Sequence, residues 1–433
     1  MNNSKILTKL FGFNPEQHSV TTEIMAGLTT FLTMAYILAV NPAILSETGM
    51  DKGALFTSAA LISGIATLLM SLIAKLPFAL GPGMGLNAFF AYTICIGMGY
   101  SWQFALTAVF IEGVIFILLT VSNLREHIVN SLPKTIQDAI SIGIGLFSAF
   151  IGLQNAGIIT ASSGTLVKLG DITSGSPLLA LIGMIITAIL MIRNIKGAML
   201  IGIVITTIIG IPMGVTHIDG LVSTPPSIEP IFAKLEWSSI LSKDMFVVVF
   251  TLLFIDLFDT IGTLIGVCKK ANMITPNGTI PRIQHAFYAD SIATTLGAIM
   301  GSSTVTTFVE SAAGVNEGGR SGLTSFTTAM CFFAALFLAP FFLSVPGAAT
   351  APVLIFVGLM MCSGLSKIDF TNYIEAIPAF ICIIFTPLAY SISDGIVFGH
   401  LSYVIINLCT KNHKKVSVGM IILAAFFLIK FLL

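Results

Sequence analysis

Apolar stretches of about 20 residues recur along the whole chain, and they constrain its fold more than any other feature. A helix of that length spans about 30 Å, the thickness of the hydrocarbon core of a membrane. Only 9% of the residues are charged and the mean hydropathy is +0.98, whereas soluble proteins carry about 25% charged residues. The sequence therefore predicts an all-α polytopic membrane protein, with the lipid bilayer as its surroundings.

Apolar windows between Pro, Gly and charged residues predict 14 transmembrane segments in two sets of seven. The first set covers 22–43, 54–75, 84–98, 101–120, 135–157, 177–193 and 197–214. The second covers 245–267, 283–300, 304–315, 322–343, 346–364, 371–390 and 392–409. We thus expect a first repeat at 1–215, a Pro-rich linker at 216–244, a second repeat at 245–409, and a tail at 410–433. An extra apolar helix at 416–433 either spans the membrane or lies at its surface.

The positions of Lys and Arg predict the orientation of the segments. The loops after odd-numbered segments contain Lys52, Lys168, Lys234 and Lys243, and most of the other basic residues lie at the N-terminus or after even-numbered segments. By the positive-inside rule, the N-terminus is predicted to be cytoplasmic. An odd number of segments in each half inverts the second half relative to the first, which is typical of secondary transporters.

Two segments begin with residues that are poor helix formers. The third opens with Gly and Pro at 81–87, and the tenth opens with Ser, Thr and Val at 301–310. Extended backbone is tolerated inside a membrane where it lines a cavity, so interruptions at matching places in two halves indicate a binding site. Tight helix packing through Gly81 and Gly85 is the alternative.

Acidic residues lie inside the predicted segments, where each costs about 2.5 kcal/mol or more and is by default a functional candidate. Asp256 and Asp259 share one face of the eighth segment, and Glu310 follows the interruption of the tenth. Asn87 occupies the corresponding place in the third segment. These side chains are expected to converge on one cavity.

Such a cavity suits a neutral, flat, hydrogen-bonding solute. A carboxylate accepts two N–H groups side by side, and the rings of Phe89 and Phe308 are candidates to stack on the solute. Crowded carboxylates in a low dielectric cannot all be ionised, so at least one is expected to exchange a proton near neutral pH. The proton-coupling candidates are Asp259, Glu310, Asp256 and Asp290, with Asp290 and Glu112 either joining a proton network or serving as structural partners.

Four long runs resemble the AzgA-like purine permeases of the nucleobase–ascorbate transporter superfamily. They are TFLTMAYILAVNP at 30–42, GMGLNAFFAY at 83–92, DLFDTIG at 256–262 and TTFVESAAG at 306–314. The resemblance implies two inverted seven-segment repeats, with discontinuous segments 3 and 10. It further implies a core domain from 22–120 plus 245–343 and a gate domain from 135–214 plus 346–409.

The resemblance also implies a function: proton-coupled uptake of hypoxanthine, guanine or adenine across the cytoplasmic membrane, by movement of the core against the gate. The residues it assigns to substrate are Asp259, Glu310 and Asn87, with Asp256 needed for binding or the transport cycle and backbone groups of Phe308 and Val309 completing the site. Uracil and xanthine relatives have a Glu at the position of Asp259 and lack Asp256, which favours the purine branch.

Other classes of function fit the sequence less well. No H-E-x-x-H, G-x-S-x-G or G-x-x-x-x-G-K-[ST] motif occurs, which argues against an enzyme and an ATP-driven pump, and no cofactor or metal site is predicted. The formal net charge of zero argues against a nucleic-acid partner. A channel, or a sodium-coupled transporter of another small neutral solute, stays open as an alternative, because carboxylates also bind cations. An elevator motion would benefit from a gate-to-gate homodimer, which we predict.

Overall fold

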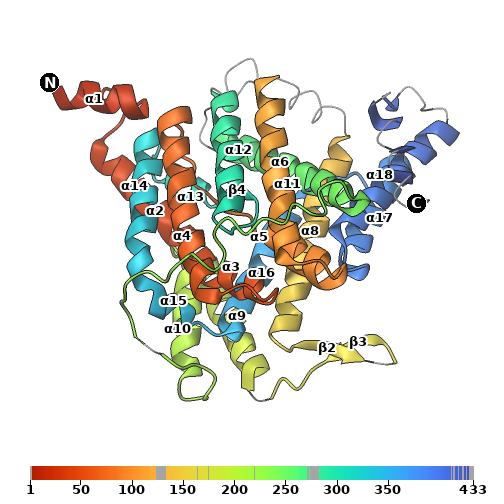
Figure 1. Ribbon diagram of the computed structural model, residues 1–433, viewed down its shortest axis with the longest axis horizontal. Helices are drawn as coiled ribbons and strands as arrows, with labels where there is room; N and C mark the ends of the chain where they lie inside the picture. The colour runs from red at the N-terminus through yellow and green to blue at the C-terminus, as the bar shows by residue number, and fades with distance from the viewer. Residues whose placement is uncertain are drawn as a thin grey trace.

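The computed structural model is a bundle of helices with two small two-stranded sheets (Figure 1). It describes residues 2–122, 133–162, 164–173, 175–218, 220–270, 273 and 282–410, and then 412, 415–417, 419–421, 424–425 and 427–428. Among these residues, seven helical stretches are long and apolar enough to cross a membrane, and shorter apolar helices accompany them. The prediction of a mostly helical membrane protein is confirmed.

The first half of the chain supplies the elements up to residue 210. They are α1 (Asn2–Phe11), α2 (Val20–Met34), α3 (Ile37–Ser46), α4 (Lys52–Leu69), β1 (Leu80–Pro82), α5 (Met84–Ala88), α6 (Trp102–Val121), α8 (Lys134–Asn155), β2 (Ile159–Ser162), β3 (Leu166–Leu169), α9 (Gly175–Ile192) and α10 (Ala198–Gly210). π-Helical turns at Met70–Ala74 and Phe89–Gly97 extend α4 and α5. Side chains of Ser19, Asp51 and Ser101 accept N–H groups of the first turns of α2, α4 and α6, which explains where these helices begin.

The second half begins with the longest helix. Its elements are α11 (Lys243–Lys270), α12 (Ile283–Ile299), β4 (Val305–Thr307), α13 (Ser311–Asn316), α14 (Gly322–Ala335), α15 (Ala339–Leu343), α16 (Gly347–Met361), α17 (Tyr373–Leu388) and α18 (Ile392–Cys409). Ser321, Asn372 and Ser391 cap α14, α17 and α18 in the same way.

The first expected segment, 22–43, lies within one apolar helical stretch of membrane length, Val20–Ser46. A two-residue turn at Ala35 and Tyr36, both with right-handed helical φ and ψ, separates α2 from α3 within this stretch. The hydroxyl of Thr33 lies 3.1 Å from the carbonyl oxygen of Thr29 and 2.9 Å from that of Thr30, and such side-chain bonds to the preceding turn bend a helix.

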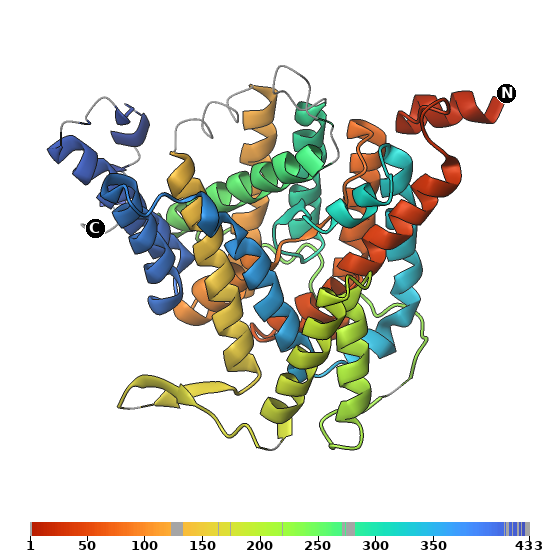
Figure 2. The ribbon, with the colours of Figure 1, turned by 180° about the vertical axis from the view of Figure 1, so that it is seen from behind.

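The helices pack into two groups (Figure 2). In one group α14 lies against α2 and α4, and α6 lies against α11 and α12. In the other, α8 lies against α16 and α17, α17 lies against α18, and α9 lies against α10. The contact between α8 and α16 is close because both carry glycine: a methyl group at Gly145 would lie 2.7 Å from the carbonyl oxygen of Gly358.

The linker between the halves packs closely along the first group of helices. The carbonyl oxygen of Pro226 accepts the hydroxyl of Thr57 on α4 at 2.8 Å. The N–H of Ala233 donates to the carbonyl of Ile299 at 2.7 Å, and the N–H of Glu236 donates to Thr107 on α6 at 2.8 Å. The segment is therefore a strap across α4, α6 and α12.

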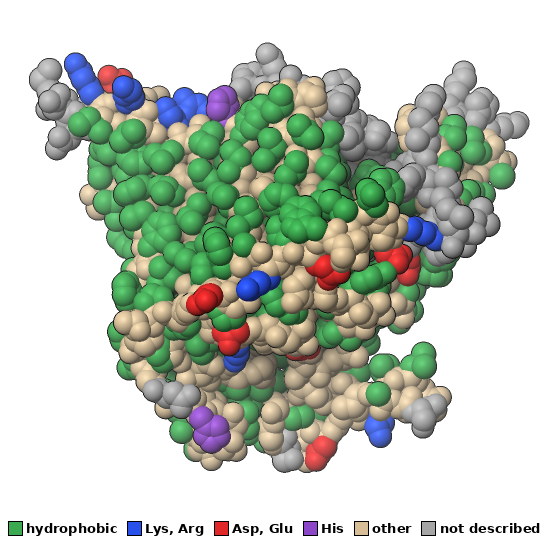
Figure 3. Space-filling view, in the orientation of Figure 1, with side chains coloured by type: hydrophobic (Ala, Val, Ile, Leu, Met, Phe, Trp, Pro, Cys, Tyr) green, Lys and Arg blue, Asp and Glu red, His purple; other side chains and the backbone are tan. Residues whose placement is uncertain are grey.

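Hydrophobic side chains dominate the outer face between α1 and the linker (Figure 3). Many large ones are exposed, including Leu118 at 63% and Ile192 at 78%. An apolar outer surface of this extent is what a lipid-facing helix bundle requires. The described part of the C-terminal tail lies against α18 and α11, where the carbonyl of Met420 is 3.1 Å from Nε2 of His400 and Phe427 packs on Phe250.

Candidate functional site

The third and tenth expected segments meet at their interruptions, where β1 and β4 form a two-stranded antiparallel sheet. Leu80 pairs with Thr307, Gly81 with Thr306 and Pro82 with Val305. The extended stretches expected there are present, and all six strand residues are buried. The crossing joins two segments that are more than 200 residues apart in the chain.

Threonines of neighbouring helices satisfy the outer edges of this small sheet. The hydroxyl of Thr67 on α4 lies 3.0 Å from the N–H of Leu80 and 3.1 Å from its carbonyl oxygen. On the other edge, Thr294 of α12 donates to the carbonyl of Val305 at 3.0 Å. Because unpaired backbone groups are costly in a membrane, these bonds allow strands to exist inside the bundle.

Two of the expected acids lie together beside β4. Glu310 is three residues after the end of the strand, and its Oε1 accepts the hydroxyl of Tyr36 at 2.7 Å. Asp259 of α11 accepts the hydroxyl of Thr306 at 3.3 Å on Oδ2. Glu310 and Asp259 lie within range of mutual electrostatic repulsion. We call Tyr36, Asp259, Thr306 and Glu310 the crossing cluster.

The crossing cluster has an accessible side. Residues 301–308 are buried, but the side chain of Val309 is 45% exposed and Asp259 and Glu310 keep part of their surface accessible. Two carboxylates that are held by protein hydroxyls beside an exposed residue are suited to accept N–H groups from a solute.

Asp256 and Asp290 form a second group on the same helices. The hydroxyl of Thr260 lies 3.0 Å from Oδ1 of Asp256 and 3.3 Å from Oδ1 of Asp290, and all three residues are fully buried. Asp290 also lies within electrostatic range of Asp259. The structure thus places Asp256 behind the crossing cluster and next to Asp290, rather than on the accessible side.

Asn87 lies on α5 and is fully buried. Its Oδ1 accepts the hydroxyl of Ser303, the residue two before β4, and its Nδ2 is 3.9 Å from the sulfur of Met84. Asn87 therefore contacts the same interrupted segment as the acids but through a neighbouring hydroxyl.

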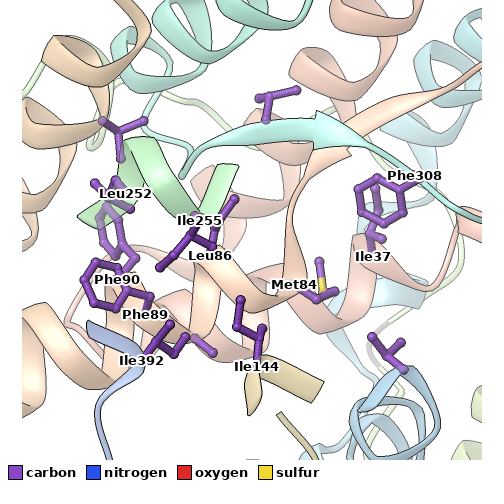
Figure 4. Close-up of a cluster of buried hydrophobic side chains, with 14 of the residues drawn as sticks. Ile37, Met84, Leu86, Phe89, Phe90, Ile144, Leu252, Ile255, Phe308 and Ile392 are labelled. Atoms are coloured by element: carbon purple, nitrogen blue, oxygen red, sulfur yellow. The ribbon is translucent and has the colours of Figure 1, made fainter. Parts of the chain in front are cut away.

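The two aromatic candidates are separated. Phe89 lies with Phe90 and Leu86, whereas Phe308 lies beside Ile37, away from them (Figure 4). Both rings are buried, Phe89 at 1% and Phe308 at 6% exposure. Of the two, Phe308 is adjacent in sequence to the accessible Val309.

Two contacts of this region were beyond sequence reasoning. The bond from Tyr36 to Glu310 joins residues 274 positions apart, and the tyrosine lies in a segment that reads as plain helix. Glu112 of α6, which the sequence left between two roles, accepts the hydroxyl of Thr304 at 2.7 Å. The sequence singled out Glu112 as an acid inside a predicted segment, but its partner Thr304 is known only from the structure.

The membrane-length apolar helices and the crossed interruptions with reachable polar groups define an integral membrane transport protein. Comparison with known proteins specifies the class further: residues 21–398 match the group described as the permease family, and the chain belongs to that family. It is a permease rather than an enzyme.

Relatives of known name cover nearly the whole chain. The adenine permease AdeQ of Escherichia coli is 40% identical over 432 residues, which is 100% of this chain and 97% of the relative. The guanine/hypoxanthine permease PbuG of Bacillus subtilis is 42% identical over 434 residues, 98% of each chain. The resemblance to purine permeases drawn from the sequence is confirmed.

Solved structures share the fold at low sequence identity. The transmembrane domain of the cyanobacterial bicarbonate transporter BicA superposes with a TM-score of 0.67 at 16% identity, over 88% of this chain and 97% of that one. This similarity shows the fold alone.

Proposed function

We propose that the protein imports purine nucleobases, namely hypoxanthine, guanine or adenine, across the cytoplasmic membrane by proton symport. The observation that carries the proposal is the reachable pair Asp259 and Glu310 at the crossing of β1 and β4. The names of relatives at 40% and 42% identity over full length support the substrate class.

In this proposal the two acids bind the substrate. A purine offers N–H donors along one edge, and separate carboxylates on α11 and after β4 can accept them from two directions. Backbone groups of Phe308 and Val309 complete the site, and Asn87 acts on it through Ser303. Phe89 stays a weaker candidate for ring stacking, because it is buried among apolar side chains.

Proton coupling rests on the crowding of carboxylates. Glu310, Asp259 and Asp290 form a chain of repelling groups in a low-dielectric interior, and Thr260 links Asp290 to Asp256. Carboxylates that repel one another in this way are expected to share a proton. A substrate that changes the charge of the site on binding can then cause the site to take up or release that proton.

We further propose fourteen segments in two inverted repeats, with core 22–120 plus 245–343 and gate 135–214 plus 346–409 moving as an elevator. The two packing groups of helices support this division, since the crossing cluster lies wholly in the first. The N-terminal helix and the β2–β3 hairpin, which follows the fifth segment, lie at opposite ends of the bundle, as an odd number of segments between them requires (Figure 1). With the distribution of Lys and Arg, this leads us to propose a cytoplasmic N-terminus. A gate-to-gate homodimer is part of the proposal.

The test is uptake of radiolabelled hypoxanthine by proteoliposomes with an imposed pH gradient, with adenine, guanine, xanthine and uracil as competitors. We expect the protein to accumulate hypoxanthine, a protonophore to abolish this accumulation, and purines but not uracil to inhibit it. Accumulation that requires sodium and ignores the protonophore would overturn proton symport, and absence of uptake or competition by any base would overturn the substrate class.

A further inference from the structure

Tyr36 is buried in the first group of helices, with 1% of its surface exposed. Its hydroxyl is 2.7 Å from Oε1 of Glu310, a distance typical of a strong bond from a hydroxyl to a carboxylate. A buried hydroxyl requires a hydrogen-bond partner, and Glu310 provides it. The contact therefore fixes one oxygen of an acid that belongs to the proposed site.

The backbone is arranged to make this contact. Tyr36 lies in the turn between α2 and α3, where Val40 and Ala39 both bond to its carbonyl at 3.0 Å. The hydroxyl of Thr33 approaches the carbonyl of Glu310 at 3.5 Å, so both sides of the turn face the start of α13. The turn in the first segment thus lies against the interrupted tenth segment.

The two acids of the crossing cluster are held alike. One oxygen of Glu310 accepts Tyr36 from the first segment, and one oxygen of Asp259 accepts Thr306 from the tenth. The second oxygen of each carboxylate is the acceptor that we assign to purine N–H groups. The angle at which Glu310 offers that oxygen depends on the bond to Tyr36.

We propose that Tyr36 is a positioning residue, which orients the carboxylate of Glu310 for purine binding and so sets the substrate affinity without taking part in the translocation step. The proposal rests on the proposed function. It identifies a residue that sets affinity in a segment where composition shows only an apolar helix.

The test is hypoxanthine uptake by proteoliposomes containing Tyr36→Phe. The expected result is a KM about tenfold higher with Vmax changed less than about twofold, because binding is weakened while the movement of the helices is not. The matched control is Tyr92→Phe, which also removes the hydroxyl of a buried tyrosine that donates to a glutamate, Glu47 at 3.0 Å. The control should keep the wild-type KM.

A merely structural role would lower the thermal stability of both tyrosine variants and leave KM unchanged. A wild-type KM in Tyr36→Phe therefore overturns the proposal, as does a loss confined to Vmax. Absence of purine uptake by the wild-type protein would instead overturn the proposed function.

If Tyr36→Phe fails to fold, the cause predicted here is the carboxylate left without its donor. Adding Glu310→Gln removes that charge, so the double variant should regain a folded, monodisperse state in detergent. A double variant that stays unfolded would show that Tyr36 acts through other contacts, and would overturn the assignment.

Discussion

β1 and β4 are partners in one small sheet, yet the segments that carry them differ in chemistry. Gly81 and Pro82 of β1 have no side-chain hydrogen-bonding group, and α5 contributes the amide of Asn87. The segment around β4 is rich in hydroxyls, and each of three donates to a side chain from a different helix. These bonds are Ser303 to Asn87, Thr304 to Glu112 and Thr306 to Asp259.

The difference separates two requirements that the crossing meets. Pairing of strands needs main-chain groups and no side chain, and the absence of a side chain at Gly81 admits the close approach of Ile37 and Phe308. Recognition of a solute needs side-chain donors and acceptors, and these are concentrated around β4 and Glu310. The two segments share one small sheet, and the segment that carries β4 holds most of the side-chain chemistry.

The largest effect should come from the acids beside β4. Glu310→Gln and Asp259→Asn are expected to lower concentrative purine uptake at least about 100-fold, because each removes a charged acceptor that neutral amides replace poorly. Uptake per molecule of protein in the membrane is the measurement, with Asp369→Asn in an exposed loop as control. Normal accumulation by both variants would move the site away from β4.

A second comparison concerns the edges of the sheet. Thr67→Val removes the hydroxyl that bonds both the N–H and the carbonyl of Leu80. Thr294→Val removes the hydroxyl that bonds only the carbonyl of Val305. At about 1 kcal/mol or more for each group, Thr67→Val should lower the thermal midpoint about twice as far. Thermal unfolding in detergent measures both, and an equal or reversed order would contradict the assignment of these bonds.

A smaller effect on purine binding is expected from Asn87, the polar residue that the first half of the chain contributes beside the crossing. Asn87→Ala should change the KM for purines a few-fold, or alter the preference among them, because Asn87 reaches the site through Ser303. Ser303→Ala should change the same quantity in the same direction. Competition assays with adenine and hypoxanthine measure it, and an effect as large as that of Glu310→Gln would show that the halves contribute equally.

Sequence reasoning located the elements that depend on local composition. The interruptions, the helices around them and the pair Asp259 and Glu310 follow from residue type and spacing, because membrane insertion penalises each departure from an apolar helix. It could not supply contacts between distant segments. The register of β1 with β4, the bond from Tyr36 to Glu310 and the burial of Phe89 away from Phe308 depend on packing that no local pattern encodes.

The smallest effect concerns the strap that joins the halves. The carboxylate of Glu236 accepts the hydroxyl of Ser101, which caps α6, at 2.6 Å and that of Ser238 at 2.9 Å, and these bonds lower the pKa of Glu236 below its ordinary value of 4.5. A carboxylate whose pKa is lower in the folded than in the unfolded protein stabilises the fold at pH values above its unfolded-state pKa. This contribution is lost as the pH falls through the folded-state pKa.

Glu236→Gln should therefore lower the thermal midpoint at pH 7 by about 1 °C, since the group is exposed to solvent, and the difference from wild type should shrink as the pH falls below about 4.5. Thermal unfolding in detergent across this pH range measures it, with Glu229→Gln on the same strap as control. A difference that persists unchanged at low pH would mean that the ionised carboxylate of Glu236 is not what stabilises the strap, because Gln keeps the shape of Glu and changes its charge and hydrogen-bonding groups.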